Sequence, residues 1–236
     1  MTKFIYATDI HGNATIYEKI FSLGSEKDID FLVFGGDITN GVTPKSQRFF
    51  LEFYLLRRIK EFKKKHKKKP IFIMMGNDDF SSNFDILKRA TNKKIIFHLH
   101  NRFYKFGDYK IAGYPFVNPT PFFLKDWEKS ENEILQDLEK LSSRLNPQKT
   151  IYVFHAPPFG TSLDLLYNRD HKGSKAIREF IEKNQPLLTL HGHIHESREV
   201  SGKIFEHIGK TLCVNPGNGK ILLVEIENLK IEEVNV

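Results

Sequence analysis

Near the start of the chain stands Lys3-Phe-Ile-Tyr-Ala-Thr-Asp-Ile-His-Gly-Asn13, and the expected architecture follows from it. Residues 3–8 are mostly apolar and predict a short buried strand, and apolar residues at helical spacing follow it. Asp9 and His11 lie between the two elements, where Gly12 lets the backbone come close to a ligand. The stretch therefore predicts a strand, a polar loop and a helix, with candidate ligands in the loop.

The same arrangement recurs twice further along the chain. Residues 30–34 form a second apolar run that leads into Gly35-Gly-Asp37, and residues 70–75 form a third that leads into Gly76-Asn-Asp-Asp79. A helical pattern over residues 45–65 connects these two runs. Such a series predicts parallel strands whose ligand crevice lies outside their carboxyl ends.

Histidines follow two later apolar runs. His155 comes directly after residues 150–154, and His191-Gly-His-Ile-His195 follows the apolar segment 186–190. Side chains two apart in an extended segment can point the same way, and neutral imidazole is a common metal ligand. By itself the cluster is also consistent with a hydrogen-bonded surface turn, so the other ligands have to come from upstream.

The remaining pattern consists of short elements. We expect β-like segments over 95–112, an amphipathic helix over 134–145, a helix capped by Ser174 and a β-meander over 199–236. The segment 114–123 is rich in proline and aromatic residues. It is interpreted as a pinned loop that buries its aromatics, with a lid over a substrate as the alternative.

Composition predicts one globular domain spanning residues 1–236. The chain has 236 residues, of which 40% are hydrophobic, and no repeat or linker divides it. Cys213 is the only cysteine, which excludes a disulfide framework and a thiolate zinc cluster. The sequence begins without a signal-peptide pattern and contains no run long enough to cross a bilayer, so we expect a cytoplasmic protein with no membrane partner.

Much of the formal net charge of +7 comes from the run Lys60 to Lys69. Cations at the end of a helix complement its dipole, and a solvated helix end is the favoured interpretation. A nucleic-acid or membrane-surface patch is the alternative. The run precedes the third strand and should lie at the amino end of that strand, away from the strand-end ligands, which makes nucleic acid a less expected partner.

Seven polar side chains are thus predicted to gather at strand ends: Asp9, His11, Asp37, Asn77, His155, His193 and His195. They suffice for two metal ions if one carboxylate bridges. The mixture of nitrogen and oxygen ligands suits manganese, iron, zinc or nickel, and is too rich in imidazole for calcium. Two ions about 3.5–4 Å apart can generate a hydroxide and neutralise charge during in-line displacement, so hydrolysis of a phosphoester is the expected reaction.

These residues carry the motifs of a known family, and the chain resembles the calcineurin-like metallophosphoesterases over nearly its whole length. The family pattern consists of Asp-x-His, Gly-Asp, Gly-Asn-His-Asp or Glu, a lone His and Gly-His-x-His. It corresponds here to Asp9-Ile-His11, Gly36-Asp37, Gly76-Asn-Asp-Asp79, His155 and Gly192-His-Ile-His195. The runs 155–161, 171–178 and 214–217 are similar to small prokaryotic phosphoesterases of the Icc type.

The resemblance implies a fold, a ligand set and a mechanism. The fold would be a four-layer α/β/β/α sandwich of two mixed sheets. Asp9, His11 and His195 would hold one divalent ion, Asn77, His155 and His193 the other, and Asp37 would bridge them. A hydroxide between the ions would attack the phosphorus, with manganese the most expected metal. His191 stands outside the motif and is expected to be structural, and Asn13, at a helix N-terminus, is a candidate substrate contact.

The chain departs from the family pattern at Asp78, where a histidine usually helps the leaving group. A carboxylate beside two dications is a poor proton donor and repels phosphate. Either the substrate needs little protonation of its leaving group, or another residue donates the proton, with His171 the first candidate.

Several functions are compatible with these motifs. The expected substrate is a small phosphorylated molecule, which could be a nucleotide, and a diesterase, a monoesterase and a nuclease remain open. A non-catalytic scaffold of the same fold is the rival interpretation, although all seven ligand positions are filled.

Overall fold

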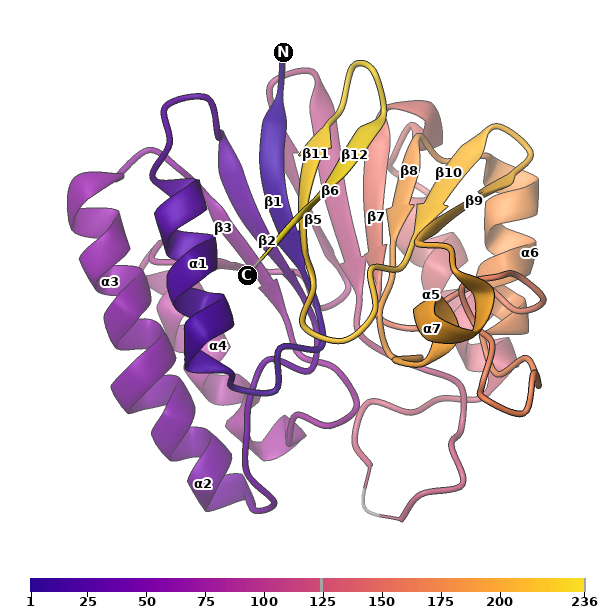
Figure 1. The fold of residues 1–236 in the computed structure, drawn as a ribbon, viewed down its shortest axis with the longest axis horizontal. Helices are drawn as coiled ribbons and strands as arrows, with labels where there is room; N and C mark the ends of the chain where they lie inside the picture. The colour runs from indigo at the N-terminus through magenta and orange to yellow at the C-terminus, as the bar shows by residue number, and fades with distance from the viewer. Residues whose placement is uncertain (124, 236) are drawn as a thin grey trace.

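Two six-stranded β-sheets lie face to face and carry helices on their outer sides in the computed structural model, which describes residues 1–123 and 125–235 (Figure 1). Both sheets are mixed. In the first, β1 to β4 are parallel and β11 and β12 are antiparallel to their neighbours. In the second, β6, β7, β8 and β10 are parallel and the two edge strands are antiparallel. The predicted four-layer sandwich is confirmed.

The strands are short. In spatial order, the first sheet contains β12 (Lys230–Val234), β11 (Ile221–Glu225), β1 (Lys3–Ala7), β2 (Phe31–Gly35), β3 (Ile71–Met74) and β4 (Phe97–His98). The second contains β5 (Arg102–Phe106), β6 (Tyr109–Tyr114), β7 (Thr150–Phe154), β8 (Leu188–Leu190), β10 (Thr211–Val214) and β9 (Phe205–Ile208).

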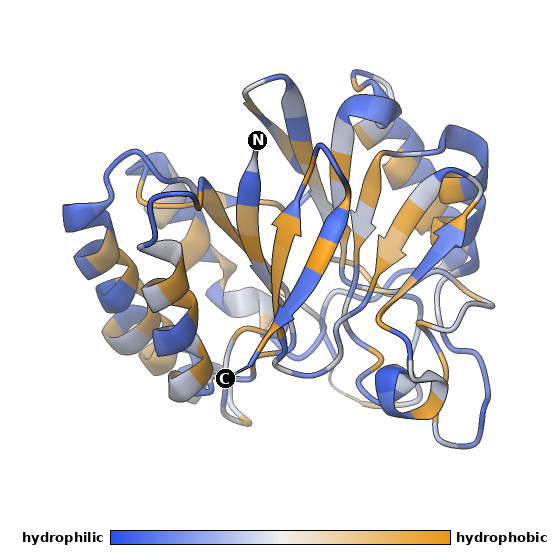
Figure 2. Cartoon of the chain, turned by 45° about the horizontal axis from the view of Figure 1, so that its top comes forward, coloured by the Kyte–Doolittle hydropathy of each residue, from blue (hydrophilic) through white to orange (hydrophobic). Residues whose placement is uncertain are grey.

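Central strands are apolar on both faces because each face packs against another layer. In β1, Phe4 and Tyr6 point into the core between the sheets, whereas Ile5 and Ala7 point into the core beneath the helices. A third core lies outside the second sheet, where Tyr152 packs among helix residues. The central strands accordingly are nearly continuous hydrophobic runs, whereas the edge strand β12 combines polar and apolar residues, as the colours of Figure 2 show.

Helices complete the outer layers. The first sheet is covered by α1 (Ala14–Gly24), α2 (Pro44–Phe49), the π-helical segment η1 (Phe50–Leu55), α3 (Leu56–Lys65) and α4 (Phe84–Asn92), and the second by α5 (Glu131–Ser142) and α6 (Lys175–Asn184). The shorter elements are η2 (Ser81–Asn83), η3 (Pro147–Lys149) and α7 (Ser197–Ser201). The helix predicted over 45–65 is therefore continuous through a π-helical turn, and Ser174 caps α6 as predicted.

The predicted C-terminal β-meander is wrong. A short helix, α7, comes first, β9 and β10 then form a hairpin on the second sheet, and β11 and β12 form another on the first. Residues 215–220 cross between the sheets, and the Gly219 amide donates to the Thr8 carbonyl at 3.3 Å. Alternating apolar residues predict strands and do not specify the sheet that each strand joins. Val236 lies outside the described residues.

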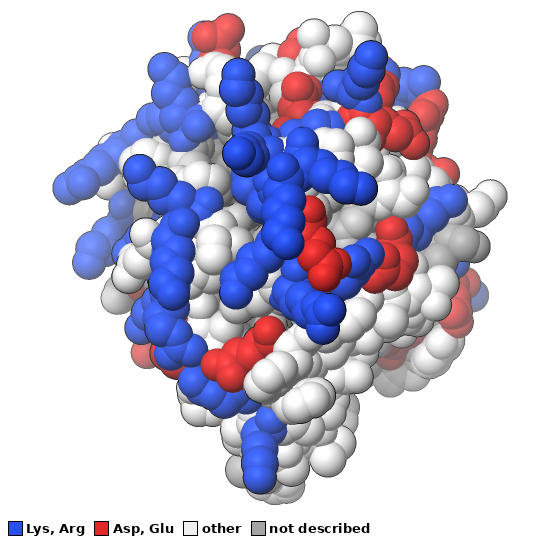
Figure 3. Space-filling model, turned by 90° about the vertical axis from the view of Figure 1, so that its left-hand side faces the viewer, with Lys and Arg blue, Asp and Glu red and all other residues white. Residues whose placement is uncertain are grey.

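The basic run lies at the end of α3 that leads to the amino end of β3, as predicted. Figure 3 shows Lys and Arg side chains gathered over this helical side of the molecule. Some of these lysines act within the fold: the Lys63 ammonium donates to the Lys67 and Lys69 carbonyls, both at 2.8 Å. Among the described residues, no helix has the length and apolar character required to cross a membrane.

Candidate metal centre

Five strands end at the same place, and each is followed by a polar side chain of the predicted set. Asp9 follows β1, Asp37 follows β2, Asn77 follows β3, His155 follows β7 and His193 follows β8. Four residues of these loops adopt positive φ although none is glycine: Asp9 (51°), His11 (46°), Asp37 (48°) and His193 (68°). Such conformations cost about 1–3 kcal/mol each and occur where surrounding structure enforces them, often at functional sites.

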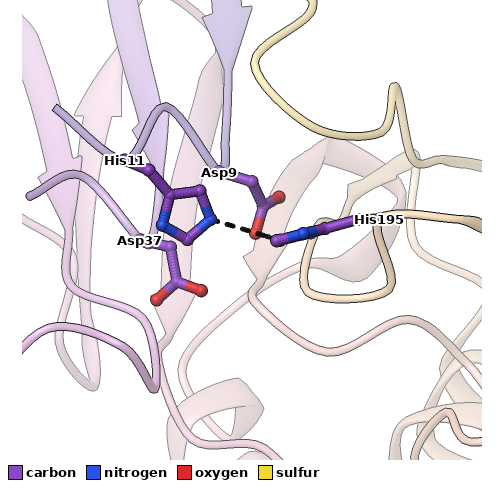
Figure 4. A group of neighbouring side chains, drawn as sticks. All are labelled: Asp9, His11, Asp37 and His195. Carbon is purple, nitrogen blue, oxygen red and sulfur yellow. Dashed lines mark hydrogen bonds and ion pairs between the residues drawn. The ribbon is translucent and has the colours of Figure 1, made fainter. Parts of the chain in front are cut away.

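Asp9, His11, Asp37 and His195 form one compact group. One ligand atom from each lies within 4.8 Å of the others, and Figure 4 shows the four side chains converging. Nε2 of His195 lies 3.2 Å from Asp9 Oδ1 and 3.3 Å from Nε2 of His11. Two carboxylates and two imidazoles at this spacing match the donor set that first-row divalent ions prefer.

The other three predicted ligands form a second group that also includes Asp37. Nε2 of His155 is 3.2 Å from both Asp37 Oδ2 and Asn77 Oδ1, and its ring centroid is 5.5 Å from that of His193. Nδ1 of His155 donates to the Gly35 carbonyl at 3.1 Å, so Nε2 is the ring nitrogen that faces this group. The structure thus brings all seven residues together, with Asp37 common to both groups.

The charges of these residues also suit a cation. Burial raises the pKa of Asp37, but His155 and His11 outweigh burial and hold the pKa well below its ordinary value. Burial opposes a charge on His155, yet Asp37 and Asp9 raise its pKa to about 10. His193 is different, because burial lowers its pKa to about 4 and keeps it neutral. The buried carboxylates of Asp9 and Asp37 are therefore stabilised by positive charge, which a metal ion could supply. The neutral imidazole of His193 lies beside them and could act as a further ligand.

Two motif glycines are required for these contacts. A Cβ atom on Gly76 would lie 2.3 Å from Asp37 Oδ1 and 2.5 Å from His155 Nε2. A Cβ atom on Gly192 would lie 2.3 Å from both Asp9 Oδ2 and Thr8 Oγ1. Real Cβ contacts are essentially never that short, so a side chain at either position would push the ligands apart.

Asp79, to which the sequence assigned no role, holds the ligand-bearing loops together. Its buried carboxylate accepts hydrogen bonds from the backbone amides of Ile38 (3.0 Å), Thr39 (2.9 Å) and Gly76 (2.9 Å). Burial and the charge of Asp37 raise its pKa to about 6. Asp79 therefore fixes the loop after β2 against the loop after β3.

His191 is part of the fold. It is fully buried, with Nδ1 2.8 Å from the Ala156 carbonyl and Nε2 2.8 Å from Thr189 Oγ1. Both ring nitrogens are engaged by protein groups, which leaves neither for an ion. This arrangement agrees with the structural role expected for His191.

A cavity of about 420 Å³ opens beside the seven residues. Its walls include four of them, Asp37, Asn77, His193 and His195. Apolar side chains, among them Pro119 and Phe122, and two lysines, Lys125 and Lys172, form other parts of the wall. Lys172 lies in the run 171–178 singled out above, whereas the sequence around Lys125 contains no motif that would have identified that lysine.

The loop over 114–123 is pinned as expected, but its last aromatics are not buried. The Val117 amide donates to the Trp127 carbonyl at 2.8 Å, whereas Phe122 is 65% exposed and Phe123 94% exposed. Backbone hydrogen bonds and Trp127, rather than these phenylalanines, anchor the loop. Because Pro119 and Phe122 line the cavity, the loop forms one wall of the site.

The remaining predicted residues lie in different surroundings. Asp78 lines the cavity. His171 is outside the cavity lining, and its Nδ1 is 2.7 Å from Oδ1 of the buried Asp164. Asn13 caps α1, with Oδ1 accepting from the amides of Thr15 and Ile16 at 3.1 and 3.3 Å. No contact among the described residues brings His171 or Asn13 to the candidate ligands, and both roles stay predictions.

Comparison with known proteins places the chain in a family. The family model described as calcineurin-like phosphoesterase matches residues 2–197, and the chain belongs to this family. Its members act as hydrolases on phosphate esters and use divalent metal ions. No curated protein matches the chain.

Solved structures support the fold. One crystal structure shares 21% identity at a TM-score of 0.73, and TT1561 of Thermus thermophilus shares 17% at 0.71; each match covers 99% of this chain and 98% of the other. A structure described as an archaeal phosphodiesterase shares 15% identity at a TM-score of 0.50, and the match covers 100% of both chains.

Proposed function

We propose that this protein is a phosphoesterase that depends on two divalent metal ions, with manganese the favoured metal. The observation that carries the proposal is the position of Asp37, whose carboxylate is shared by two groups of ligand side chains. One oxygen faces His155, and the ligand atom that Asp37 offers to the other group lies within 4.8 Å of those of Asp9, His11 and His195. A shared carboxylate is what a pair of neighbouring ions requires.

The residues are assigned to two sites. Asp9, His11 and His195 would hold one ion, Asn77, His155 and His193 would hold the other, and Asp37 would contribute to both sites. When bound, such ions supply a nucleophile derived from water and neutralise charge on the phosphate. The protein contributes the rigid strand-end loops, the hydrogen bond from His155 to Gly35 that sets the tautomer, and the cavity that receives the ester.

The cavity supports a small phosphorylated substrate rather than a nucleic acid. It has room for a mononucleotide or a similar ester, and Phe122 offers an aromatic surface on its wall. The lysine-rich run lies at the amino end of β3, whereas the candidate ligand Asn77 follows its carboxyl end. A polynucleotide held by that run would not lead into the cavity, which argues against a nuclease.

Metal analysis combined with turnover tests the proposal. Purified protein should contain up to two ions per chain, and added manganese should support hydrolysis of a chromogenic phosphodiester or phosphomonoester. Asp37→Asn should lose both metal and activity. His191→Asn, which changes a buried residue outside the ligand set, is the matched control.

Two outcomes would reject the proposal. Wild-type protein that binds no divalent metal would exclude the ligand assignment. Protein that binds metal and hydrolyses neither diesters, monoesters nor cyclic nucleotides would favour the non-catalytic scaffold.

A further inference from the structure

Asp78, which occupies the usual histidine position of the family motif, forms an ion pair with Lys125. Lys125 Nζ contacts Asp78 Oδ1, which also accepts a hydrogen bond from Asn77 Nδ2 at 3.1 Å. The Asp78 amide donates to Asp37 Oδ1 at 2.8 Å. The ion pair is therefore attached to two of the candidate metal ligands.

The loop that carries Lys125 is fixed to the same turn by three successive residues. After Lys125, the carboxylate of Asp126 accepts from the Ser81 amide at 2.7 Å, and the Trp127 indole donates to the Asp79 carbonyl at 2.8 Å. Three contacts within residues 78–81 leave the lysine little freedom to leave the cavity. Its side chain is 25% exposed.

The pairing changes the charge that a substrate meets beside Asn77. A lone Asp78 carboxylate would repel a phosphate, and the Lys125 ammonium neutralises it. An ammonium has three N–H donors, and Asp78 accepts from it through one oxygen, so donors remain for a further anion. Both side chains line the cavity together with Asp37 and His193.

We infer that Lys125 binds the phosphate group of the substrate, in the place where the family motif has its histidine, and that Asp78 is the positioning residue that holds it there. The inference rests on the proposed phosphoesterase function and deepens it. The ammonium donates charge-assisted hydrogen bonds to phosphate oxygens from the side of Asn77. The enzyme thus uses a lysine and carboxylate pair where its relatives use a single imidazole.

Phosphate binding measures this role without requiring turnover. Inorganic phosphate is titrated calorimetrically into the wild-type protein and into Lys125→Ala, Lys125→Arg and Lys129→Ala, and bound metal is quantified in each sample. Lys129 is the matched control: it pairs with Asp137 at 2.6 Å with similar exposure, 27%, and does not line the cavity. Lys125→Ala should weaken binding by about 10- to 100-fold, since hydrogen bonds to charged groups contribute this much. Lys125→Arg should retain part of the affinity, and Lys129→Ala all of it.

A second substitution separates charge from folding. In the Lys125→Ala background, the Asp78 carboxylate faces the phosphate uncompensated. Adding Asp78→Asn should therefore strengthen phosphate binding relative to Lys125→Ala alone. A double variant that binds phosphate no better than the single variant would show that Asp78 does not oppose the anion, and the inference would fail.

Further outcomes are decisive as well. Equal phosphate affinity in Lys125→Ala and Lys129→Ala overturns the inference, and so does loss of bound metal from Lys125→Ala, because the pair would then support the metal centre. Wild-type protein that shows the Lys125 effect on phosphate but hydrolyses no ester would reject the proposed function and leave Lys125 as an anion-binding residue.

Discussion

Replacing Gly76 by alanine should disable both proposed metal sites with one methyl group. The Cβ atom would lie 2.3 Å from Asp37 Oδ1 and 2.5 Å from His155 Nε2, whereas ordinary contact begins at 3.4 Å. The carboxylate oxygen would have to move by about 1 Å, and metal ligands tolerate only about 0.2 Å. Because Asp37 is common to both groups, we expect metal affinity to fall by at least the roughly 10- to 100-fold seen when supporting residues are lost.

A matched substitution separates this effect from a general loss of stability. Gly24, at the end of α1, is the control because neither Gly24 nor Gly76 has a positive φ. A Cβ atom on Gly24 would lie 2.8 Å from a methyl group of Leu32, and this side chain can move. Overpacking costs about 1–3 kcal/mol in either case, or about 2–12 °C in Tm for a chain of this size. Calorimetric titration with Mn²⁺ and thermal melts are run on both variants. Gly76→Ala protein that binds manganese as tightly as Gly24→Ala would refute the assigned geometry.

Three further predictions concern single histidines. His191→Ala should keep both ions but lower the free energy of unfolding by about 2–4 kcal/mol, because two buried partners lose their hydrogen bonds. His193→Ala and His195→Ala should each empty one metal site preferentially. Equal metal loss from all three variants would contradict the assignment. If His171 donates the proton as the sequence predicts, His171→Ala should lower turnover by about 10²-fold or more in steady-state assays, and turnover close to wild type would exclude that role. In metal-free protein, the pKa of His155 is raised from 6.5 to about 10. Its contribution to stability is therefore complete below pH 6.5 and lost as the pH rises to about 10. The Tm of protein treated with a chelator should fall across that interval, and a Tm that does not change with pH would exclude the charged imidazole.

The gathering of the candidate ligands was predictable from the sequence because each lies directly after a strand or in the loop that follows it. Residues 3–8 and 30–34 contain almost continuous apolar runs, and parallel strands necessarily end at one edge, which brings Asp9 and Asp37 together. His155 adds a candidate ligand from the end of β7, in the second sheet, by the same rule. Local pattern and strand direction were sufficient to group these residues.

The C-terminal strands and the loop before Trp127 were not predictable in this way. The strands of residues 205–234 have similar apolar alternation, and their division between two sheets depends on partners far away, as when β11 pairs with β1. Lys125 lies 47 residues from Asp78, and its position follows from Trp127 and Asp126 binding the turn after β3. Contacts between residues this far apart produce no periodicity or motif spacing in the sequence.

Asp79 connects the candidate ligands, which were predicted from the sequence, with the loop of Lys125, which was not. Its carboxylate binds the amides of Ile38 and Gly76, on the loops that carry Asp37 and Asn77, while its carbonyl accepts the Trp127 indole at 2.8 Å. One residue thus binds the loops of these candidate metal ligands and the loop of Lys125 to the same turn. The distance between the proposed ions and the phosphate-binding ammonium is then set by the backbone of residues 76–79, and not by closure of a loop. Binding of phosphate should consequently require no rearrangement of this wall.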